Sequence, residues 1–144
     1  GEQGIVDEID PGKNYPSFAG MLDLSQLWSL LAHAELLVCP DTGAAHLGRI
    51  VGTPTVTLFG PGSPMLCGAG EFWRNSPYRA IVADVSCRNQ HKFFRREIGW
   101  VQRCGRGTKE CETPECMRAI SLNEVTTVID ELLTPSTQPN HPGQ

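Results

Sequence analysis

The chain from residue 36 to residue 64 reads LLVCPDTGAAHLGRIVGTPTVTLFGPGSP, and the rest of the sequence is organised around this stretch. The apolar run 36–39 is short and uninterrupted, as in strands that are buried on both faces. Asp41 or Thr42 can cap the helix that follows, which a glycine then ends. Residues 55–59 form a second buried strand. The pattern predicts a strand, a sharp turn, a helix and a strand.

The first turn of this predicted helix carries almost no side-chain bulk, because Gly43 is followed by Ala44 and Ala45. Backbone N–H groups there can approach an anion closely, and the helix dipole favours negative charge at that end. Helical side chains tilt toward the N-terminus, so His46 is expected to lean over the same opening. The turn therefore predicts an anion site at the carboxyl edge of a parallel sheet.

The composition is that of a globular protein of 144 residues with one core, 40% hydrophobic and 19% charged. A formal net charge of −4 argues against a nucleic-acid partner. No apolar run approaches the roughly 20 residues of a membrane span, and the acidic N-terminus is no signal peptide. We therefore expect a cytoplasmic protein, in which six cysteines are thiols or metal ligands more often than disulfides.

The flanking segments give further elements. Residues 1–20 show no clear period and predict at most a short strand near 4–6. A helix begins after Asp23, with Asp23 or Ser25 as its cap, and a third strand spans Tyr78–Val82. A last helix begins at Ser121 with a capping-box pattern. Apolar residues lie on one face of each helix: Leu24, Leu27, Trp28, Leu30 and Leu31 in the first, and Val125, Val128, Ile129, Leu132 and Leu133 in the last.

These elements predict an α/β fold, a Rossmann-like parallel sheet with flanking helices. We assign 1–133 to a partial Rossmann-like domain with a cysteine-bearing insert at about 85–116, and 134–144 to a disordered tail. Three strands are fewer than the five or more of most nucleotide-binding sheets. We therefore expect the chain to be the carboxyl-terminal part of a longer enzyme, or to borrow sheet from a partner.

The motif Asp-Thr-Gly-Ala-Ala-His-Leu at 41–47 resembles the heptosyltransferases, glycosyltransferase family nine. The resemblance extends to the segments 24–32, 52–54, 58–61 and 116–121. It implies the donor-binding, carboxyl-terminal half of a GT-B fold, in an inverting glycosyltransferase that uses ADP-heptose. The implied acceptor is of the lipopolysaccharide type or a protein, and the implied location is the bacterial cytoplasm, with peripheral contact to the inner membrane.

The resemblance also implies roles for individual residues. Thr42, Gly43 and Ala44 would bind the pyrophosphate, and His46 would donate to a phosphate oxygen. Asp41 would bind donor hydroxyls. The loop before the first helix resembles the segment that brackets the adenine of the donor in this family. The Gly-Pro pair after the second strand also matches the family. Those segments add the donor-site residues Met21, Leu22 and Gly60.

The catalytic base is not expected within this chain. In the family the base is an acidic residue of an amino-terminal domain, which nothing in these 144 residues matches. The family also often reads Gly-Pro-Thr-Asp-Pro where this sequence has Gly-Pro-Gly-Ser-Pro at 60–64, so contacts to the donor sugar differ. As it stands, the chain is expected to bind the donor without catalysing transfer.

The structural alternative for the turn is a helix cap without a ligand, with Asp41 as the cap and His46 as its partner. Arg49 lies on the same helix face as His46 and could reach a phosphate. Its alternative is a solvated or salt-bridged arginine.

Four cysteines lie within thirty positions among basic residues, namely Cys87, Cys104, Cys111 and Cys116. Four converging thiolates would bind zinc or iron. The segment also resembles a carboxyl-terminal insert that holds an iron site in relatives that modify autotransporter proteins. The spacing lacks a Cys-x-x-Cys pair, so reduced thiols and disulfides remain alternatives. The basic charge favours either an anionic partner, such as a phosphorylated lipid or a membrane surface, or a solvated loop.

Two other functions fit the same sequence. One is a different GT-B nucleotide-sugar enzyme, either an epimerase or a transferase. The other is a non-catalytic interaction module that a metal stabilises on a degenerate Rossmann scaffold.

Overall fold

The computed structural model describes residues 2–107 and 109–134. Its centre is a parallel sheet with the strand order β1-β2-β3, in which Leu37 pairs with Thr55 and Thr55 pairs with Tyr78. The elements in chain order are α1 (Glu2–Ile9), α2 (Leu24–Ala32), β1 (Leu37–Pro40), α3 (Gly43–Val51), β2 (Thr55–Phe59), α4 (Pro64–Cys67), β3 (Tyr78–Val82), β4 (Lys92–Phe93), β5 (Arg96–Glu97), α5 (Glu115–Arg118) and α6 (Leu122–Leu133).

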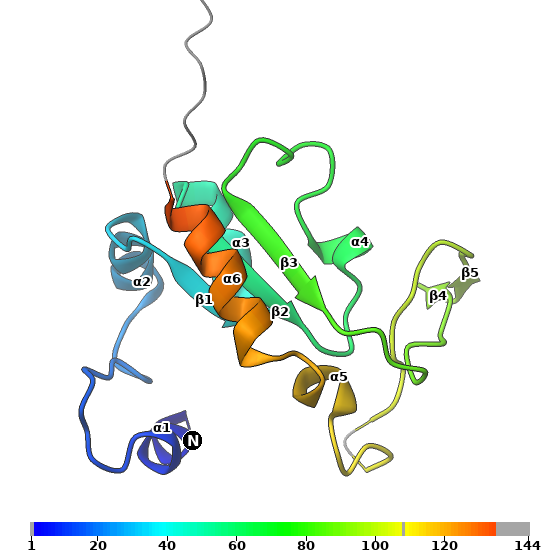
Figure 1. Cartoon of the computed structure of the whole chain (residues 1–144), viewed down its shortest axis with the longest axis horizontal. Helices are drawn as coiled ribbons and strands as arrows, with labels where there is room; N and C mark the ends of the chain where they lie inside the picture. The colour runs from blue at the N-terminus through cyan, green and yellow to red at the C-terminus, as the bar shows by residue number, and fades with distance from the viewer. Residues whose placement is uncertain (1, 108, 135–144) are drawn as a thin grey trace, which may run out of the picture.

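The sheet is covered on both faces, with α6 in front of it and α3 behind it (Figure 1). The helix α2 packs against α3, and the antiparallel hairpin β4–β5 stands apart from the sheet. This arrangement confirms the predicted α/β fold with a parallel sheet and flanking helices. The two strands predicted at 55–59 and 78–82 have the bounds expected, and β1 begins one residue later than predicted.

The helix α3 packs on the sheet through a glycine, and a larger residue would not fit there. A Cβ atom at Gly48 would lie 2.7 Å from the side chains of both Leu37 and Thr55. The helix ends at Gly52, whose φ of 82° is in the left-handed region that glycine favours. The connector is then fixed by the Thr53 hydroxyl, which donates to the Leu31 carbonyl at 2.6 Å. These contacts hold the second half of α3 and its exit on the sheet, while its N-terminus follows β1 after two residues.

The helix α2 has the cap that the sequence predicts. The Asp23 carboxylate accepts from the Gln26 backbone N–H at 2.8 Å, and the Gln26 side chain accepts from the Asp23 N–H at 2.9 Å. Its predicted apolar face is less covered than expected. Leu31 is buried, whereas Leu24 and Trp28 are 68% and 44% exposed. The apolar face of α6 is also half-buried at most, and its Ser121 hydroxyl accepts from Glu124 N–H.

The strand predicted near residues 4–6 is wrong, because these residues lie in the helix α1. The apolar residues Ile5, Val6 and Ile9 recur at helical spacing, and a strand there would need a neighbour in the sheet. The predicted disordered tail falls almost entirely outside the described residues. Within the described ranges, no helix combines the length and the apolar character that crossing a membrane requires.

Candidate functional site

The turn between β1 and α3 has an open helix N-terminus. Thr42 is the N-cap residue in extended conformation, at φ −139° and ψ 177°, and its hydroxyl makes no capping bond. The N–H groups of Gly43 and Ala44 belong to the first turn, where an α-helix offers no carbonyl partner. Adding a Cβ to Gly43 would meet no atom within 4 Å, so the space beside it is open. The turn therefore presents N–H donors and a hydroxyl to one opening.

Neither Asp41 nor Thr42 caps α3 through its side chain, so the predicted cap, which the structural alternative also required, is wrong. The Thr42 side chain makes no cap bond, and within the described residues no hydrogen bond joins the Asp41 carboxylate to α3. His46 has a different partner, since its Nδ1 lies within hydrogen-bond reach of the Arg49 guanidinium. A guanidinium can only donate, so Nδ1 accepts and the ring proton lies on Nε2. His46 is exposed, so Nε2–H is available as a donor to a ligand.

The alternative for Arg49, a solvated or salt-bridged side chain, is wrong. Arg49 is 5% exposed, and it donates to the carbonyls of Gly68 and Cys67, the second at 3.1 Å. Its guanidinium carbon also lies 4.9 Å from the centre of the Tyr78 ring. The two ion pairs in the described residues, Arg74–Glu71 and Lys92–Glu97, do not involve it. A buried cation without a carboxylate partner thus lies one helical turn beneath the opening.

Three protonated groups near the turn, Tyr78, Cys39 and Cys67, stay neutral at physiological pH. Burial raises the pKa of the Tyr78 hydroxyl, and burial also raises the pKa of the Cys39 thiol. The pKa of the Cys67 thiol is raised by burial and by the negative charge of Asp41. Because these side chains keep their protons, the charges that act on them are those of Asp41, Arg103 and Arg49.

The loop Gly60–Ser63 forms the second wall of the site. A Cβ atom at Gly62 would collide with the Asp41 carboxylate, so glycine lets the loop lie directly against that side chain. A Cβ atom at Gly60 would lie 3.0 Å from the Met117 sulfur and 3.7 Å from the Cys116 sulfur. Gly60 is therefore a packing position in this structure, and its predicted contact with a donor stays a prediction.

Arg88 fixes this loop, and sequence reasoning did not single it out. It is 8% exposed and donates to the carbonyls of Gly60, of Gly62 at 2.6 Å, and of Gln102 at 3.3 Å. In the sequence it is one of several basic residues near the cysteines, and no periodic pattern distinguishes it. Its role follows from chain geometry that a sequence pattern does not contain.

The residues expected to bracket an adenine lie in the turn before α2. Met21 is 69% exposed and Leu22 is half-buried. The left-handed residue Gly20 precedes them, at φ 69°. An exposed methionine beside a half-buried leucine can provide the apolar contacts that a base needs, and their role stays a prediction.

The four cysteines of the segment 85–116 do not converge. Cys104 and Cys116 are buried, and the Cys104 N–H donates to the Pro61 carbonyl at 2.9 Å. Cys111 donates through sulfur to the Thr113 carbonyl, and Cys87 lines a pocket elsewhere. All six cysteines are unpaired, and the described residues contain no group of three His, Cys, Asp or Glu side chains able to bind a metal ion. The donor set therefore does not fit the predicted zinc or iron site.

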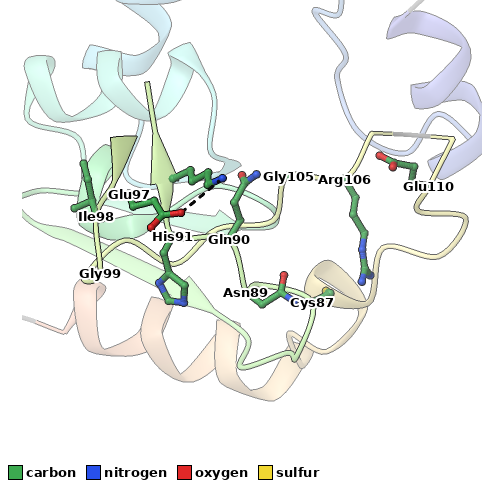
Figure 2. A pocket seen from close by; sticks show the side chains of 11 residues that line it. Cys87, Asn89, Gln90, His91, Glu97, Ile98, Gly99, Gly105, Arg106 and Glu110 are labelled. Atoms are coloured by element: carbon green, nitrogen blue, oxygen red, sulfur yellow. Dashed lines mark ion pairs between the residues drawn. The ribbon is translucent and has the colours of Figure 1, made fainter. Parts of the chain in front are cut away.

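Figure 2 shows the pocket that Cys87 lines, which has a volume of about 640 Å³. Glu97 is directed toward Lys92, with which it forms an ion pair of 3.7 Å, and not toward the Cys87 sulfur. The segment is instead ordered by the fully buried Val101 and by paired backbone bonds between Gln90 and Arg103. A cross-link is thus not what shapes this polar segment.

Comparison with known proteins agrees with the resemblance in the sequence. The family model for glycosyltransferase family 9 (heptosyltransferase) matches residues 1–97. The lipopolysaccharide core heptosyltransferase OpsX of Haemophilus influenzae is 30% identical over 89 residues, 58% of this chain and 23% of that protein. Lipopolysaccharide heptosyltransferase 1 of Salmonella typhimurium is 31% identical over 67 residues, 46% of this chain and 21% of that protein.

Lipopolysaccharide heptosyltransferase 3 of Escherichia coli is 29% identical over 93 residues, 59% of this chain and 27% of that protein. The chain therefore spans about a quarter of the length of the curated relatives it matches. No solved structure matches it significantly.

Proposed function

We propose a function that starts from one premise: this chain belongs to glycosyltransferase family 9, the heptosyltransferases. In that function the turn Asp41–His46 binds the diphosphate of a nucleotide-sugar donor, with ADP-heptose as the donor. The observation that carries the proposal is the open N-terminus of α3, whose N-cap hydroxyl is not used as a cap. It is supported by the buried, unpaired charge of Arg49 beneath the same turn.

The proposed contacts follow from the chemistry of the turn. The N–H groups of Gly43 and Ala44 and the Thr42 hydroxyl donate to phosphate oxygens, as helix N-termini do for anions. His46 donates through Nε2, because Arg49 occupies Nδ1. Asp41 lies against Gly62 and accepts from hydroxyls of the donor, since two anions would repel each other.

The turn would also assist the reaction. When the glycosidic bond of the donor breaks, negative charge develops on the departing nucleoside diphosphate. Fixed N–H dipoles and the nearby guanidinium stabilise that charge without reorganising. We propose that transfer inverts the anomeric centre, and that the base acting on the acceptor hydroxyl belongs to an acceptor-binding domain outside these residues. The acceptor is a lipopolysaccharide core or a protein.

Calorimetric titration with ADP tests the proposal. We expect micromolar binding to the full chain, and its loss in the double variant Thr42→Val with His46→Ala. The variant His33→Ala is the matched control, because His33 is an exposed helix-end histidine outside the turn and its loss should leave binding unchanged. A folded chain that does not bind ADP, or a double variant that binds like the parent, would contradict the proposal.

We also propose that the protein acts in the cytoplasm at the inner membrane surface. Residues 87–109 contain seven of the twelve Lys and Arg residues and one of the sixteen acidic residues. The tip of the β4–β5 hairpin exposes Phe94 to 83%, beside the exposed Arg95 and Arg96. An aromatic ring flanked by cations suits an anionic lipid surface.

Co-sedimentation with vesicles tests this location. We expect the chain to sediment with vesicles that contain phosphatidylglycerol, less so with pure phosphatidylcholine, and less so in high salt. Phe94→Ser should reduce the bound fraction. Equal binding to the two vesicle types would contradict the proposal.

A further inference from the structure

Arg103 is a half-buried cation of the cysteine-bearing segment. Its side chain makes no hydrogen bond or ion pair with any residue that the structure describes, and its Nε atom is enclosed by protein without a partner. We propose that the Arg103 guanidinium binds the donor diphosphate at the turn Asp41–His46, so that donor binding holds the cysteine-bearing segment against the turn. The inference rests on the proposed function, which supplies the diphosphate.

Backbone bonds place Arg103 against the loop that follows β2. The N–H of the next residue, Cys104, donates to the Pro61 carbonyl at 2.9 Å. In the same loop, Gly62 lies directly against the Asp41 carboxylate, because a Cβ atom there would collide with it. A single loop therefore separates Arg103 from the turn, although the two are about sixty positions apart in the sequence.

The Cys67 thiol, at the end of α4, shows which way the Arg103 side chain is directed. Burial raises the pKa of this thiol, the charge of Asp41 raises it further, and Arg103 lowers it more than Arg49 does. Arg49 is itself close, since it donates to the Cys67 carbonyl at 3.1 Å. The Arg103 guanidinium therefore lies on the side of its segment that faces α4 and the turn.

Three arginines surround the turn and the loop after β2, and they differ in the donors that remain for a ligand. Arg49 is buried, and its terminal nitrogens contact His46 and two carbonyls. Arg88 is also buried and donates to three carbonyls. The N–H groups of Arg103 have no acceptor among the described residues. An enclosed N–H without an acceptor costs free energy, which an anion can recover when the side chain turns toward it.

The charges at the turn favour a diphosphate as the ligand of Arg103. The donors of α3 are neutral N–H groups and a hydroxyl, and Asp41 adds a negative charge that repels an anion. A cation that contacts the ligand directly offsets this repulsion, whereas Arg49 lies beneath the helix surface. A planar guanidinium can also donate to two phosphate oxygens at once.

Calorimetric titration of the full chain with ADP and with inorganic pyrophosphate tests this role. Arg103→Gln should weaken the binding of both ligands about tenfold, as expected when a charged hydrogen bond is lost. Arg103→Lys keeps the charge without the planar fork and should weaken both about threefold. The matched control is Arg106→Gln, which removes the same charge from an exposed position of the segment and should change ADP affinity less than about twofold.

Urea unfolding and amide hydrogen exchange separate ligand binding from a structural role. Because the Arg103 side chain bonds to no described residue, Arg103→Gln should keep the unfolding midpoint of the parent. Residues 90 and 103 exchange two backbone bonds, so ADP should slow the exchange of these amides in the parent and not in Arg103→Gln.

Three results would overturn the role of Arg103. The first is a variant Arg103→Gln that binds ADP like the parent, which would leave the proposed function intact. The second is weaker binding of ADP without weaker binding of pyrophosphate, because it would place Arg103 on the nucleoside. The third is a parent chain that does not bind ADP, which would contradict the proposed function as well.

Discussion

The strand–turn–helix region, residues 37–59, and the cysteine-bearing segment, residues 85–116, meet at the loop Gly60–Ser63 but are built differently. The first is regular: two parallel strands joined by a nine-residue helix. The second contains a two-residue-per-strand hairpin and a single helical turn, and most of its length is irregular. Its order comes from Val101, which is fully buried, and from Arg88, which donates to three carbonyls.

The difference shows two ways to position a functional surface. The turn Asp41–His46 is placed by local pattern and by the close contact of Gly48 with the sheet. A cavity of about 530 Å³, lined in part by Ser63, Asp84 and Trp100, lies where the buried Arg88 ties a polar segment to the loop after β2. The turn Asp41–His46 should therefore tolerate changes in the cysteine-bearing segment. The cavity, in contrast, should be lost when Arg88 is replaced.

The largest effect is expected for Arg88→Met. Three buried or half-buried carbonyls would lose their donor, which should lower the free energy of unfolding by about 3 kcal/mol. Urea unfolding measures the loss. Arg106→Met is the control, because Arg106 is exposed and should stay within about 0.5 kcal/mol of the parent. If the two variants were equally stable, the cysteine-bearing segment would not depend on Arg88.

Gly48→Ala tests the regular region. The added methyl group would overlap Leu37 and Thr55, so we expect the free energy of unfolding to fall by about 2 kcal/mol. Gly4→Ala is the matched control in another helix, with no atom within 4 Å of its Cβ, and should raise stability by about 0.7 kcal/mol. A neutral Gly48→Ala in urea unfolding would mean that α3 can move away from the sheet.

Thiol labelling sharpens the comparison within the cysteine-bearing segment. Cys87 and Cys111 are half-buried, whereas Cys104 and Cys116 are buried, so the first pair should react at least about tenfold faster in native buffer. Mass spectrometry after timed reaction with iodoacetamide gives the order. If all four thiols reacted equally slowly and a chelator made all of them reactive, the four cysteines would bind a metal, which would contradict this arrangement.

The smallest effect concerns the cap of α2. Hydrogen bonds from the Gln26 backbone N–H and the Ser25 hydroxyl lower the pKa of Asp23. A lowered pKa in the folded state means that Asp23 stabilises the fold above its unfolded pKa of about 3.9 and loses that contribution as the pH falls through the folded value. Asp23→Asn keeps the cap bond without titrating, so its stability should approach that of the parent below pH 4. A constant difference from pH 7 to pH 3 would exclude this linkage.

The sequence predicted the regular region well and the cysteine-bearing segment poorly, for a physical reason. Strands such as 55–59 and caps such as Asp23 depend on neighbours in the chain, so a local pattern contains them. Arg88 and Arg49 depend on carbonyls fourteen to twenty-eight residues away, and no periodicity reports such contacts. The helix α1 was missed because Gly4 and the acidic residues around it weaken the helical pattern.

The candidate site divides in the same way. The open start of α3 could be predicted because glycine and alanine leave a helix start without side-chain bulk, and its binding of an anion stays a prediction. The tautomer of His46 could not, because it depends on a guanidinium that packs from the next turn. The cavity at the carboxyl ends of β2 and β3 combines three segments that are distant in sequence, so it became visible from the structure alone.

Backbone amide shifts in an NMR titration test the central claim most directly. ADP and adenosine differ in the diphosphate, so the signals that respond to ADP alone report the phosphate contacts. We predict that the amides of Gly43 and Ala44 shift strongly with ADP and not with adenosine. Diphosphate-dependent shifts confined to the basic residues 88–106, with the α3 amides unmoved, would contradict the assignment of this turn.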